Sequence, residues 1–322
     1  MSAMQASSRI FVAGHRGLIG SAVLRRLREH GHDNLLVMPR SELDLRDAAA
    51  VARFFAARRP EFVVMAAGRV GGIVENTMHP AEFMDENLAI QLAVLKAARD
   101  ADVKKLIFFG SSCMYPRECP QPMAEDALLS GKPEPTSLPY AISKLAGVFL
   151  CLAYNRQLGE QRFIPVIPNS AYGPNDDFDP ATGHVLSALM ARFDAARRAG
   201  RDGVTLWGTG APRREFVHAD DIADACIHIL RQDVSSLALP VNIGTGTDIS
   251  ICDLARMVAD TVGYAGRIEW DATKPDGAPR KLLDSGRLHA FGWRHRVALA
   301  EGLRRTYDWY SRNGSGLDKA DA

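Results

Sequence analysis

The sequence has little of what marks a protein of membranes, nucleic acids or disulfide frameworks. Its formal net charge is only +1, so no overall field recruits nucleic acid or an anionic membrane, and an anionic ligand depends on local Arg and Lys groups. Residues 1–8 are polar and short, and no later apolar run comes near the roughly 20 residues that span a bilayer. We therefore expect a cytoplasmic protein with no nucleic-acid or membrane partner.

Cysteines are few and lack a recognisable pattern. The chain has five of them and no C-x-x-C pair, which argues against a disulfide framework or a structural zinc site and suits a reducing compartment. We expect no metal site, and one cysteine remains a candidate for catalysis.

What the sequence does have is an alternation of short apolar runs with segments of helical spacing. A chain of 322 residues, 47% hydrophobic and 24% charged, can bury one large core or two smaller ones. The alternation implies β-α-β units, and hence an α/β fold with a doubly wound parallel sheet. The predicted strands are Ile10–Ala13, Leu35–Met38, Phe62–Ala66, Leu106–Phe109 and Arg162–Ile167, and the helical segments lie near 20–30, 46–58, 81–101 and 140–157.

A glycine-rich turn follows the first predicted strand. Gly14, Gly17 and Gly20 come directly after Ile10–Ala13, and apolar residues at helical spacing come next. A buried strand, a glycine turn and a helix can seat a dinucleotide pyrophosphate on the helix N-terminus. The same glycines could also mark no more than a tight strand-to-helix turn. The cofactor contacts predicted here are Gly14, Arg16, Gly17, Leu18, Ile19 and Gly20.

The end of the second strand indicates which dinucleotide is bound. Enzymes that use NAD usually have an acid there to hold the ribose 2′-hydroxyl, but this strand runs into Pro39-Arg40. Arg40 and Arg16 could instead bind a 2′-phosphate through charge-assisted hydrogen bonds, which favours NADPH. The alternative is that both are solvated surface arginines. Asp44 and Leu45 would then lie near the adenine.

The candidate catalytic residues lie in the middle of the chain. Tyr140 and Lys144 are four residues apart on a predicted helix and so share a face. We expect the ammonium to lower the pKa of the phenol and make Tyr140 a usable proton donor. Ser111, at the end of a predicted strand, can bond the same substrate oxygen. A Tyr-x-x-x-Lys pair alone is weak, because it arises often by chance.

Together these motifs resemble the extended short-chain dehydrogenase/reductase superfamily. Longer strings, spread over nearly the whole chain, are similar to those of the GDP-L-fucose synthases. They are Ala66-Ala-Gly68, Val70-Gly-Gly-Ile73, Gly110-Ser-Ser-Cys-Met-Tyr-Pro116, Gln121-Pro-Met-Ala-Glu125, Glu134-Pro-Thr136, Pro139-Tyr-Ala-Ile-Ser-Lys144, Arg213-Arg-Glu-Phe-Val-His218 and Lys274-Pro-Asp-Gly-Ala-Pro-Arg-Lys-Leu-Leu283.

The resemblance implies a two-part reaction on a GDP-linked sugar. That family epimerises C3 and C5 of GDP-4-keto-6-deoxy-D-mannose and then reduces C4 with NADPH, giving GDP-L-fucose. Both carbons are α to the C4 carbonyl, so loss of either proton places charge on the C4 oxygen, where Tyr140 and Ser111 can stabilise it. The family's cysteine and histidine, one acting as base and one as acid, match Cys113 and His184. On sequence alone, Cys113 could be a small buried hydrophobe and His184 a capping or surface residue.

The remaining site residues also follow from the resemblance. Lys144 would bond the nicotinamide ribose, and Asn87 could order this array or simply lie on a helix surface. Arg192 could instead form a surface salt bridge. The further cofactor contacts are Ala66, Ala67, Gly68, Tyr140, Lys144 and Pro168. The residues expected at the diphosphate or sugar are Arg192, Arg214 and Lys281, and those expected at the nucleoside are Val185, Leu189 and Trp207. Such enzymes pair as homodimers through two helices, here near 85–100 and 140–157.

One segment departs from the family pattern. The usual Pro-Thr-Asn-Leu-Tyr-Gly-Pro is replaced by Pro168-Asn-Ser-Ala-Tyr-Gly-Pro174, so Ser170 occupies the asparagine position. The hydroxyl differs in reach and hydrogen-bonding capacity, which leaves a colitose or 6-deoxy-heptose epimerase/reductase open. The sequence also leaves open a 4-keto reductase or 4,6-dehydratase without epimerase activity, and a non-catalytic dinucleotide-binding regulator. A dehydratase would be expected to have Asp-Glu at Ser112-Cys113.

The second half of the chain is less regular and indicates a smaller lobe. It has a helical pattern at 185–199, an apolar run at 204–207 and another helical pattern at 220–230, and no internal repeat. The Pro, Gly and Asp cluster at 168–183 is the best candidate boundary. We predict a Rossmann domain for NADP at 1–168, with 215–245 returning to it. Residues 169–214 and 246–322 would form a nucleotide-sugar lobe over the carboxyl edge of the sheet.

Overall fold

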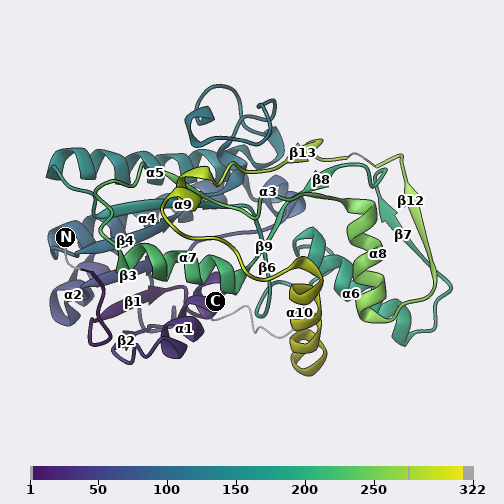
Figure 1. Ribbon diagram of the computed structural model, residues 1–322, viewed down its shortest axis with the longest axis horizontal. Coiled ribbons are helices and arrows are strands. Elements are labelled where there is room, and N and C mark those ends of the chain that lie inside the picture. Colours follow the sequence, from purple (N-terminus) through teal and green to yellow (C-terminus); the bar gives the residue numbers. More distant parts are fainter. Residues whose placement is uncertain (1–2, 275, 315–322) are drawn as a thin grey trace.

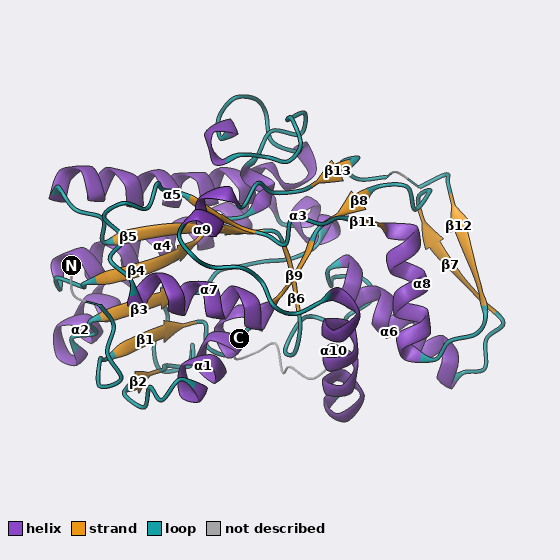
Figure 2. Cartoon of the chain, viewed as in Figure 1, coloured by secondary structure: helices purple, strands orange, loops and turns teal. Residues whose placement is uncertain are grey.

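The computed structural model describes residues 3–274 and 276–314. Its larger region is a six-stranded sheet with helices on both faces, and a smaller region of helices and short strand pairs adjoins one end (Figures 1 and 2). Every strand pairing in the large sheet is parallel. The strands, in spatial order, are β10 (Val241–Ile243), β5 (Phe163–Pro168), β4 (Lys105–Phe109), β3 (Phe62–Met65), β1 (Ile10–Ala13) and β2 (Leu35–Leu36). The predicted doubly wound α/β fold is confirmed.

The winding of the sheet reverses between β1 and β3. From β1 the chain proceeds to β2 on one side and then crosses to β3 on the other. Ligands of such sheets bind outside the carboxyl ends of the strands at this reversal. The turns that leave β1, β3 and β4 at this edge carry Gly14, Ala66–Gly68 and Ser111.

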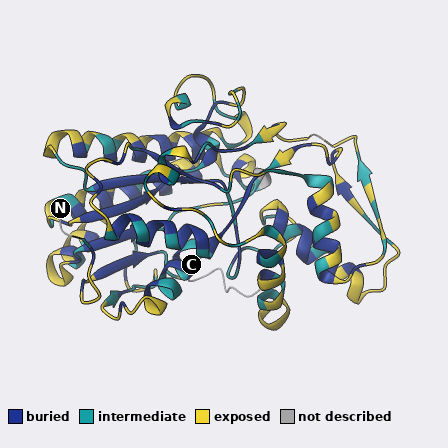
Figure 3. Cartoon of the chain, viewed as in Figure 1, coloured by how far each residue is buried: buried dark blue, intermediate teal, exposed yellow. Residues whose placement is uncertain are grey.

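Successive strand residues face two different helix layers. Ile10 and Val12 belong to the same core cluster as the buried residues of α1 (Leu18–Glu29) and α7 (Ala219–Arg231). Phe11 and Ala13 pack with the opposite layer, which consists of α2 (Ala48–Arg58), α4 (Pro80–Asp100) and α5 (Leu138–Leu158). Because both faces are covered, the strands are apolar without alternation except for the buried Lys105 that begins β4, and Figure 3 shows them buried along their length.

Local sequence explains where the helices begin and end. The Asp47 carboxylate accepts the amides of Ala49 and Ala50 at 2.9 Å and so caps α2. Gly159, with φ of 72°, ends α5 in the left-handed conformation. Shorter helices connect the larger ones: α3 (Ile73–Met78), α9 (Gly286–Ala290) and the 3-10 turns η1 (Ser112–Met114), η2 (Glu125–Ala127) and η3 (Pro135–Ser137).

The smaller region has its own core. It is formed by α6 (Val185–Arg198), α8 (Ile251–Val262) and α10 (Leu299–Asn313). Three small sheets complete it: β7 (Gly203–Trp207) with β12 (Arg267–Asp271), β6 (Ser170–Tyr172) with β9 (Phe216–His218), and β11 (Ile249–Ser250) with β8 (Arg213–Arg214) and β13 (Arg280–Lys281). The parallel β8–β13 register places Lys281 opposite Arg214.

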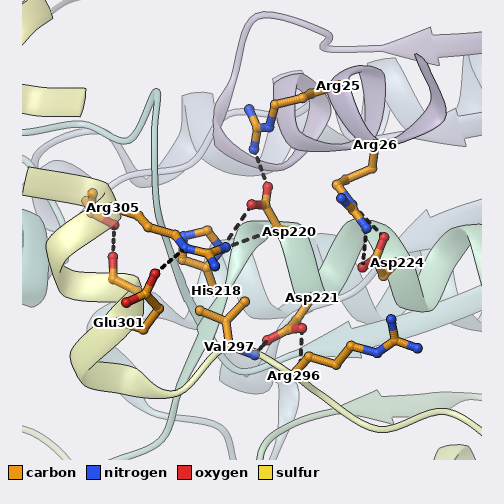
Figure 4. Close-up of polar contacts among 12 residues, drawn as sticks. Arg25, Arg26, His218, Asp220, Asp221, Asp224, Arg296, Val297, Glu301 and Arg305 are labelled. Carbon is orange, nitrogen blue, oxygen red and sulfur yellow. Dashed lines mark hydrogen bonds and ion pairs between the residues drawn. The ribbon is translucent and has the colours of Figure 1, made fainter. Parts of the chain in front are cut away.

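A polar cluster ties α7 to its neighbours (Figure 4). The buried His218 side chain caps α7 by accepting the Asp220 amide at 3.2 Å. Asp221 accepts the amides of Arg296 and Val297 at 2.9 and 3.0 Å, and these residues lead into α10. Ion pairs join α1 to α7 through Arg25 with Asp220 and Arg26 with Asp224.

The helices and strands predicted in both halves of the chain are present, with small shifts at their ends. The second strand is shorter than predicted: β2 covers Leu35–Leu36 and does not reach Met38, because it is an edge strand and the chain turns at Pro39, whose carbonyl accepts the amides of Glu42 and Leu43. The sequence analysis did not reveal six strands of two or three residues, which are too short to carry a periodic signal. It also missed two long amphipathic helices near the end of the chain, at 251–262 and 299–313.

One expectation about apolar runs is wrong. Helix Pro135–Leu158, which includes α5, is long and apolar enough to span a bilayer, with a mean hydropathy of 1.4 in its most apolar window. In that window 44% of the residues are buried, and α5 packs against α4 and β5. Core helices of globular proteins pass the same test, so this feature alone is weak support for a membrane span.

Candidate active site

The turn after β1 is shaped by close backbone contacts. Gly14 has φ of 76°, and a Cβ there would lie 2.7 Å from the amide nitrogen of Ala67. A Cβ at Gly20 would lie 2.0 Å from the Gly14 carbonyl oxygen. Gly17 is the N-cap of α1 and has no side chain to bond the first amides of the helix. Leu18 and Ile19 begin α1. Because Gly17 provides no side-chain cap, the first amides of the helix are available to an anionic ligand.

The residues expected at the adenosine end include two exposed arginines and an ion-paired aspartate. Arg16 and Arg40 are exposed. Asp44 forms an ion pair with Arg46, whose Nη2 lies 2.6 Å from Oδ2. Arg46, and to a lesser degree Arg40, lower the pKa of Asp44 to about 2. Leu45 is half-buried and packs against the core on its side of the sheet. The sequence did not single out Arg46.

The turn after β3 brings the cofactor edge against the catalytic helix. A Cβ at Gly68 would lie 2.8 Å from Asn87 Oδ1 and 3.4 Å from Lys144 Nζ. Asn87 is 2% exposed, so the surface role considered for it is wrong. Its amide nitrogen donates to the carbonyls of Phe83 and Arg69, and its oxygen accepts the Arg69 amide at 3.1 Å. Asn87 thus fixes the segment that follows Ala66 and Ala67. Pro168, the other predicted contact, ends β5.

Ser111, Tyr140 and Cys113 meet at the carboxyl end of β4. The Ser111 hydroxyl accepts the Cys113 amide at 3.2 Å, and it forms side-chain hydrogen bonds with the Tyr140 phenol and the Cys113 thiol. Tyr140 and Lys144 are both buried on α5, one turn apart. The structure therefore brings together four of the five predicted catalytic residues around the end of one strand.

The expected effect of Lys144 on Tyr140 is wrong. The Lys144 ammonium lies 5.9 Å from the centre of the Tyr140 ring and 5.3 Å from that of Phe108, over the ring faces. Burial, and then the negative charge of Cys113, raise the pKa of Tyr140, while the Ser111 hydrogen bond opposes them. Burial also lowers the pKa of Lys144 to about 8. Spacing along a helix could not reveal that burial outweighs the lysine charge.

Cys113 is half-buried and is surrounded by cations. Lys281 Nζ lies 3.8 Å from its Sγ. Burial raises the pKa of the thiol, but Lys281, hydrogen bonds with Ser111 and Ser137, and the His184 charge together lower it below its ordinary value. The Cys113 charge also acts on Arg214, whose pKa is lowered by burial. The thiolate is thus favoured more than in an ordinary cysteine.

His184 is the N-cap residue of α6, and its charge acts on the Cys113 thiol. Its side chain is 45% exposed, and its Nδ1 lies 3.7 Å from Oδ1 of the buried Asp176. Asp176, the Cys113 charge and Asp177 raise the pKa of His184 against the effect of its partial burial. The surroundings therefore shift the two groups in opposite senses: they favour the thiolate form of Cys113 and the imidazolium form of His184.

The other residues expected at the nucleotide sugar lie mostly on α6 and β7. Leu189 is buried, Val185 is exposed, and Arg192 donates to the Pro180 carbonyl at 2.8 Å. Trp207 is 60% exposed, and Lys274 Nζ lies 5.6 Å from its ring centre. Of this set, Lys281 contacts Cys113 and Arg214 interacts with its charge.

Similarity to known proteins extends over the same elements. The NAD dependent epimerase/dehydratase family matches residues 10–244. This chain belongs to that epimerase/dehydratase family. It is 50% identical over 307 residues to GDP-L-fucose synthase 1 of Arabidopsis thaliana, covering 95% of this chain and 94% of that protein. The resemblance predicted from the sequence is therefore confirmed.

Solved structures of similar sequence agree with the fold. A GDP-6-OMe-4-keto-L-xylo-heptose reductase from C. jejuni is similar with a TM-score of 0.91 and 34% identity, over 97% of this chain and 99% of that one. A GDP-mannoheptose C4 reductase from Campylobacter jejuni with NADP bound has a TM-score of 0.87 and 36% identity, over 96% and 99% of the two chains.

The segment 168–174, which departs from the usual family pattern, forms a buried hydrogen bond through Asn169. Asn169 is buried, and its amide donates to Glu215 Oε2 at 2.6 Å. Glu215 is itself fully buried and also accepts the amides of Thr245, Gly246 and Leu283. Asn169 therefore belongs to a buried hydrogen-bonded cluster around Glu215. The neighbouring Ser170 is half-buried and so is the more accessible of the two.

Proposed function

We propose that this protein is an NADPH-dependent 3,5-epimerase and 4-reductase of a GDP-4-keto-6-deoxy sugar, with GDP-4-keto-6-deoxy-D-mannose as substrate and GDP-L-fucose as product. The observation that carries this proposal is the pairing of a thiol beside Lys281 with an imidazole beside Asp176, next to Ser111 and Tyr140. A reductase without epimerase activity has no need of an acid and a base held in opposite charge states.

The cofactor site is proposed at the turn after β1. The tight packing of Gly14 and Gly20 leaves backbone amides and the N-terminus of α1 for the pyrophosphate. Arg16 and Arg40 would bind the 2′-phosphate, and the pairing of Asp44 with Arg46 removes a free carboxylate from its vicinity. When bound, NADPH supplies the hydride that reduces C4. The NADP-bound heptose reductase supports this choice of cofactor.

Cys113 and His184 are proposed to exchange the protons at C3 and C5. The lowered pKa of Cys113 provides a thiolate base, and the raised pKa of His184 provides an imidazolium acid. The base removes the proton beside the carbonyl, and the acid returns one to the opposite face of the ring. Opposite protonation states at one pH are what inversion requires.

Tyr140 and Ser111 are proposed to hold the C4 oxygen throughout. Because its pKa is raised, Tyr140 keeps its proton at neutral pH and acts as a hydrogen-bond donor to the developing enolate. It then protonates the oxygen as C4 is reduced. The buried Lys144 would bind the nicotinamide ribose.

The GDP group is proposed to lie between the two regions of the molecule. Arg214 and Lys281, opposite each other in the β8–β13 register, present adjacent positive charges to a diphosphate. Trp207 is 60% exposed, which suits stacking on a guanine. Arg192, Val185 and Leu189 would complete the nucleoside contacts.

A related sugar is the second candidate. The similarity to a heptose reductase at a TM-score of 0.91, together with Ser170 at the departing position, favours a GDP-linked 4-keto heptose as that candidate. A GDP-colitose precursor is tested in the same experiment.

The wider organisation is also a proposal. Residues 1–168 with 215–245 would bind NADP, and 169–214 with 246–322 would bind the sugar nucleotide; within these ranges, 1–2, 275 and 315–322 lie outside the described residues. Exposed apolar side chains on α4 and α5, among them Leu92, Ile142 and Phe149, support a homodimer formed through these two helices. We further propose a cytoplasmic enzyme without nucleic-acid or membrane partners.

The test is to mix the protein with NADPH and each GDP-4-keto sugar and to follow absorbance at the reduced-cofactor band. Mass spectrometry and NMR then identify the product. Oxidation of NADPH with GDP-L-fucose as product supports the leading proposal, and a preference for the heptose supports the second. No oxidation with any of these sugars overturns both.

A further inference from the structure

A buried carboxylate lies directly behind the His184 imidazole. Asp176 is 4% exposed and occupies the loop between β6 and α6. Its Oδ1 lies 3.7 Å from His184 Nδ1 and accepts the Asp177 amide at 2.8 Å, and its Oδ2 accepts the Ser187 hydroxyl. Among the residues that the structure describes, His184 is the basic side chain paired with this carboxylate. Burying a charge without a cation partner is costly, so the imidazole is the group that compensates it.

We propose that Asp176 is a positioning residue for the acid of the epimerisation: it bonds His184 Nδ1–H, leaves Nε2 to face the sugar, and keeps the ring charged. This inference rests on the proposed function, in which His184 returns protons to C3 and C5. A carboxylate that bonds one ring nitrogen fixes which nitrogen exchanges protons with the substrate. At 3.7 Å the two atoms lie beyond hydrogen-bond distance in the free protein, and we expect the contact to tighten when substrate binds.

The surroundings of Asp176 keep it in place. Ser187 belongs to the first turn of α6 and is fully buried, so its hydroxyl holds one carboxylate oxygen while the other remains aimed at His184. The charged groups that act on the imidazole are Asp176, Asp177 and Cys113. Asp177 has its own partner, the Thr182 hydroxyl at 2.9 Å. Asp176 is therefore the carboxylate whose loss most affects the ring.

The test follows the titration of His184 by NMR in the free protein. The chain has nine histidines, and the His184→Asn variant assigns the signal. In the wild type we expect titration above the ordinary histidine value. In Asp176→Asn we expect the proton affinity of His184 to fall by about tenfold, since the loss of one ionic partner lowers the pKa of a histidine by roughly one unit. Asp177→Asn makes the same charge change one residue away and is the matched control, with a shift of less than half that size expected.

The second readout is the exchange of the C3 and C5 protons with deuterated solvent. Because the pKa of His184 is raised, its proton is retained to higher pH in the wild type and lost at lower pH in Asp176→Asn. The pH above which the exchange rate falls should therefore decrease by about one unit in Asp176→Asn, and in Asp176→Glu it should return part of the way to the wild-type value. NADPH binding should be unchanged in both variants.

The outcomes separate this proposal from the proposed function. If the wild-type protein neither exchanges protons nor oxidises NADPH with any GDP-4-keto sugar, the proposed function is wrong, and the NMR titration alone decides the Asp176–His184 pair. An unshifted His184 titration in Asp176→Asn overturns the positioning role, as does a loss of exchange that is equal at every pH. If Asp176→Asn does not fold, a wild-type His184 that titrates at or below the ordinary value overturns it instead.

Discussion

The cofactor edge and the epimerising pair of this protein are built in different ways. Around β1 the site is made of backbone. At Gly14 and Gly20 an added Cβ would collide with neighbouring backbone atoms, and both glycines lie within seven consecutive residues. The acid and base depend instead on charges brought from distant segments, since Lys281 reaches Cys113 across 168 positions of sequence. A backbone site is lost when its shape changes, whereas a charge-tuned site is altered gradually with pH.

Removing the base should have the largest effect. In Cys113→Ser the hydroxyl cannot ionise near neutral pH, so exchange of the C3 and C5 protons should fall by roughly a thousandfold. NADPH binding, measured by fluorescence, should be retained because the cofactor edge is untouched. Cys252→Ser, which replaces another half-buried cysteine, is the control. Undiminished exchange in Cys113→Ser would show that another base acts.

Removing the phenol should affect reduction more than exchange. In Tyr140→Phe, NADPH oxidation should fall by roughly 100- to 1000-fold, because one preorganised donor to a developing oxyanion is lost. Exchange should fall less, since Ser111 still bonds the C4 oxygen. Tyr154→Phe, on the same helix, should change neither. Equal losses in Tyr140→Phe would contradict this division between the two hydroxyls.

Changing the backbone shape should damage the cofactor edge alone. A Cβ at Gly20 would overlap the Gly14 carbonyl oxygen, so Gly20→Ala must move the turn at a cost of about 1–3 kcal/mol. We expect NADPH affinity to fall by about 5- to 150-fold, as titration would measure, while the Cys113 thiol titrates as before. Gly203→Ala adds a Cβ with ordinary 3.8 Å contact and is the control. Unchanged affinity in Gly20→Ala would remove the glycine turn from the cofactor site.

The smallest effect should come from the cofactor's 2′-phosphate contact. Arg40→Glu replaces an exposed cation with an anion, and we expect the preference for NADPH over NADH, measured as a ratio of kcat/KM, to fall by about tenfold or more. Arg53→Glu makes the same charge change on an exposed part of α2. A preference that is the same in both variants would place Arg40 outside this contact.

The difference between the two regions also explains what the sequence could predict. The glycine turn and the Tyr140–Lys144 pair were found because each is a local pattern on one strand, turn or helix. Cys113 and His184 emerged through family resemblance, since no spacing connects them. The contact of Lys281 with Cys113 and the role of Asp176 were missed, because tertiary folding alone brings these side chains together. The direction of the Tyr140 pKa was wrong because burial cannot be read from a four-residue spacing.

The proposed chemistry depends on a free enzyme that holds Cys113 as a thiolate while Tyr140 keeps its proton. Titration of the Cys113 thiol, followed by thiolate absorbance against pH, measures this directly. The signal of the other four cysteines is measured in Cys113→Ser and subtracted. We expect a pKa below the ordinary cysteine value in the wild type, and a higher one in Lys281→Met, so that less thiolate remains at neutral pH. Titration at or above the ordinary value, unchanged in Lys281→Met, would contradict it.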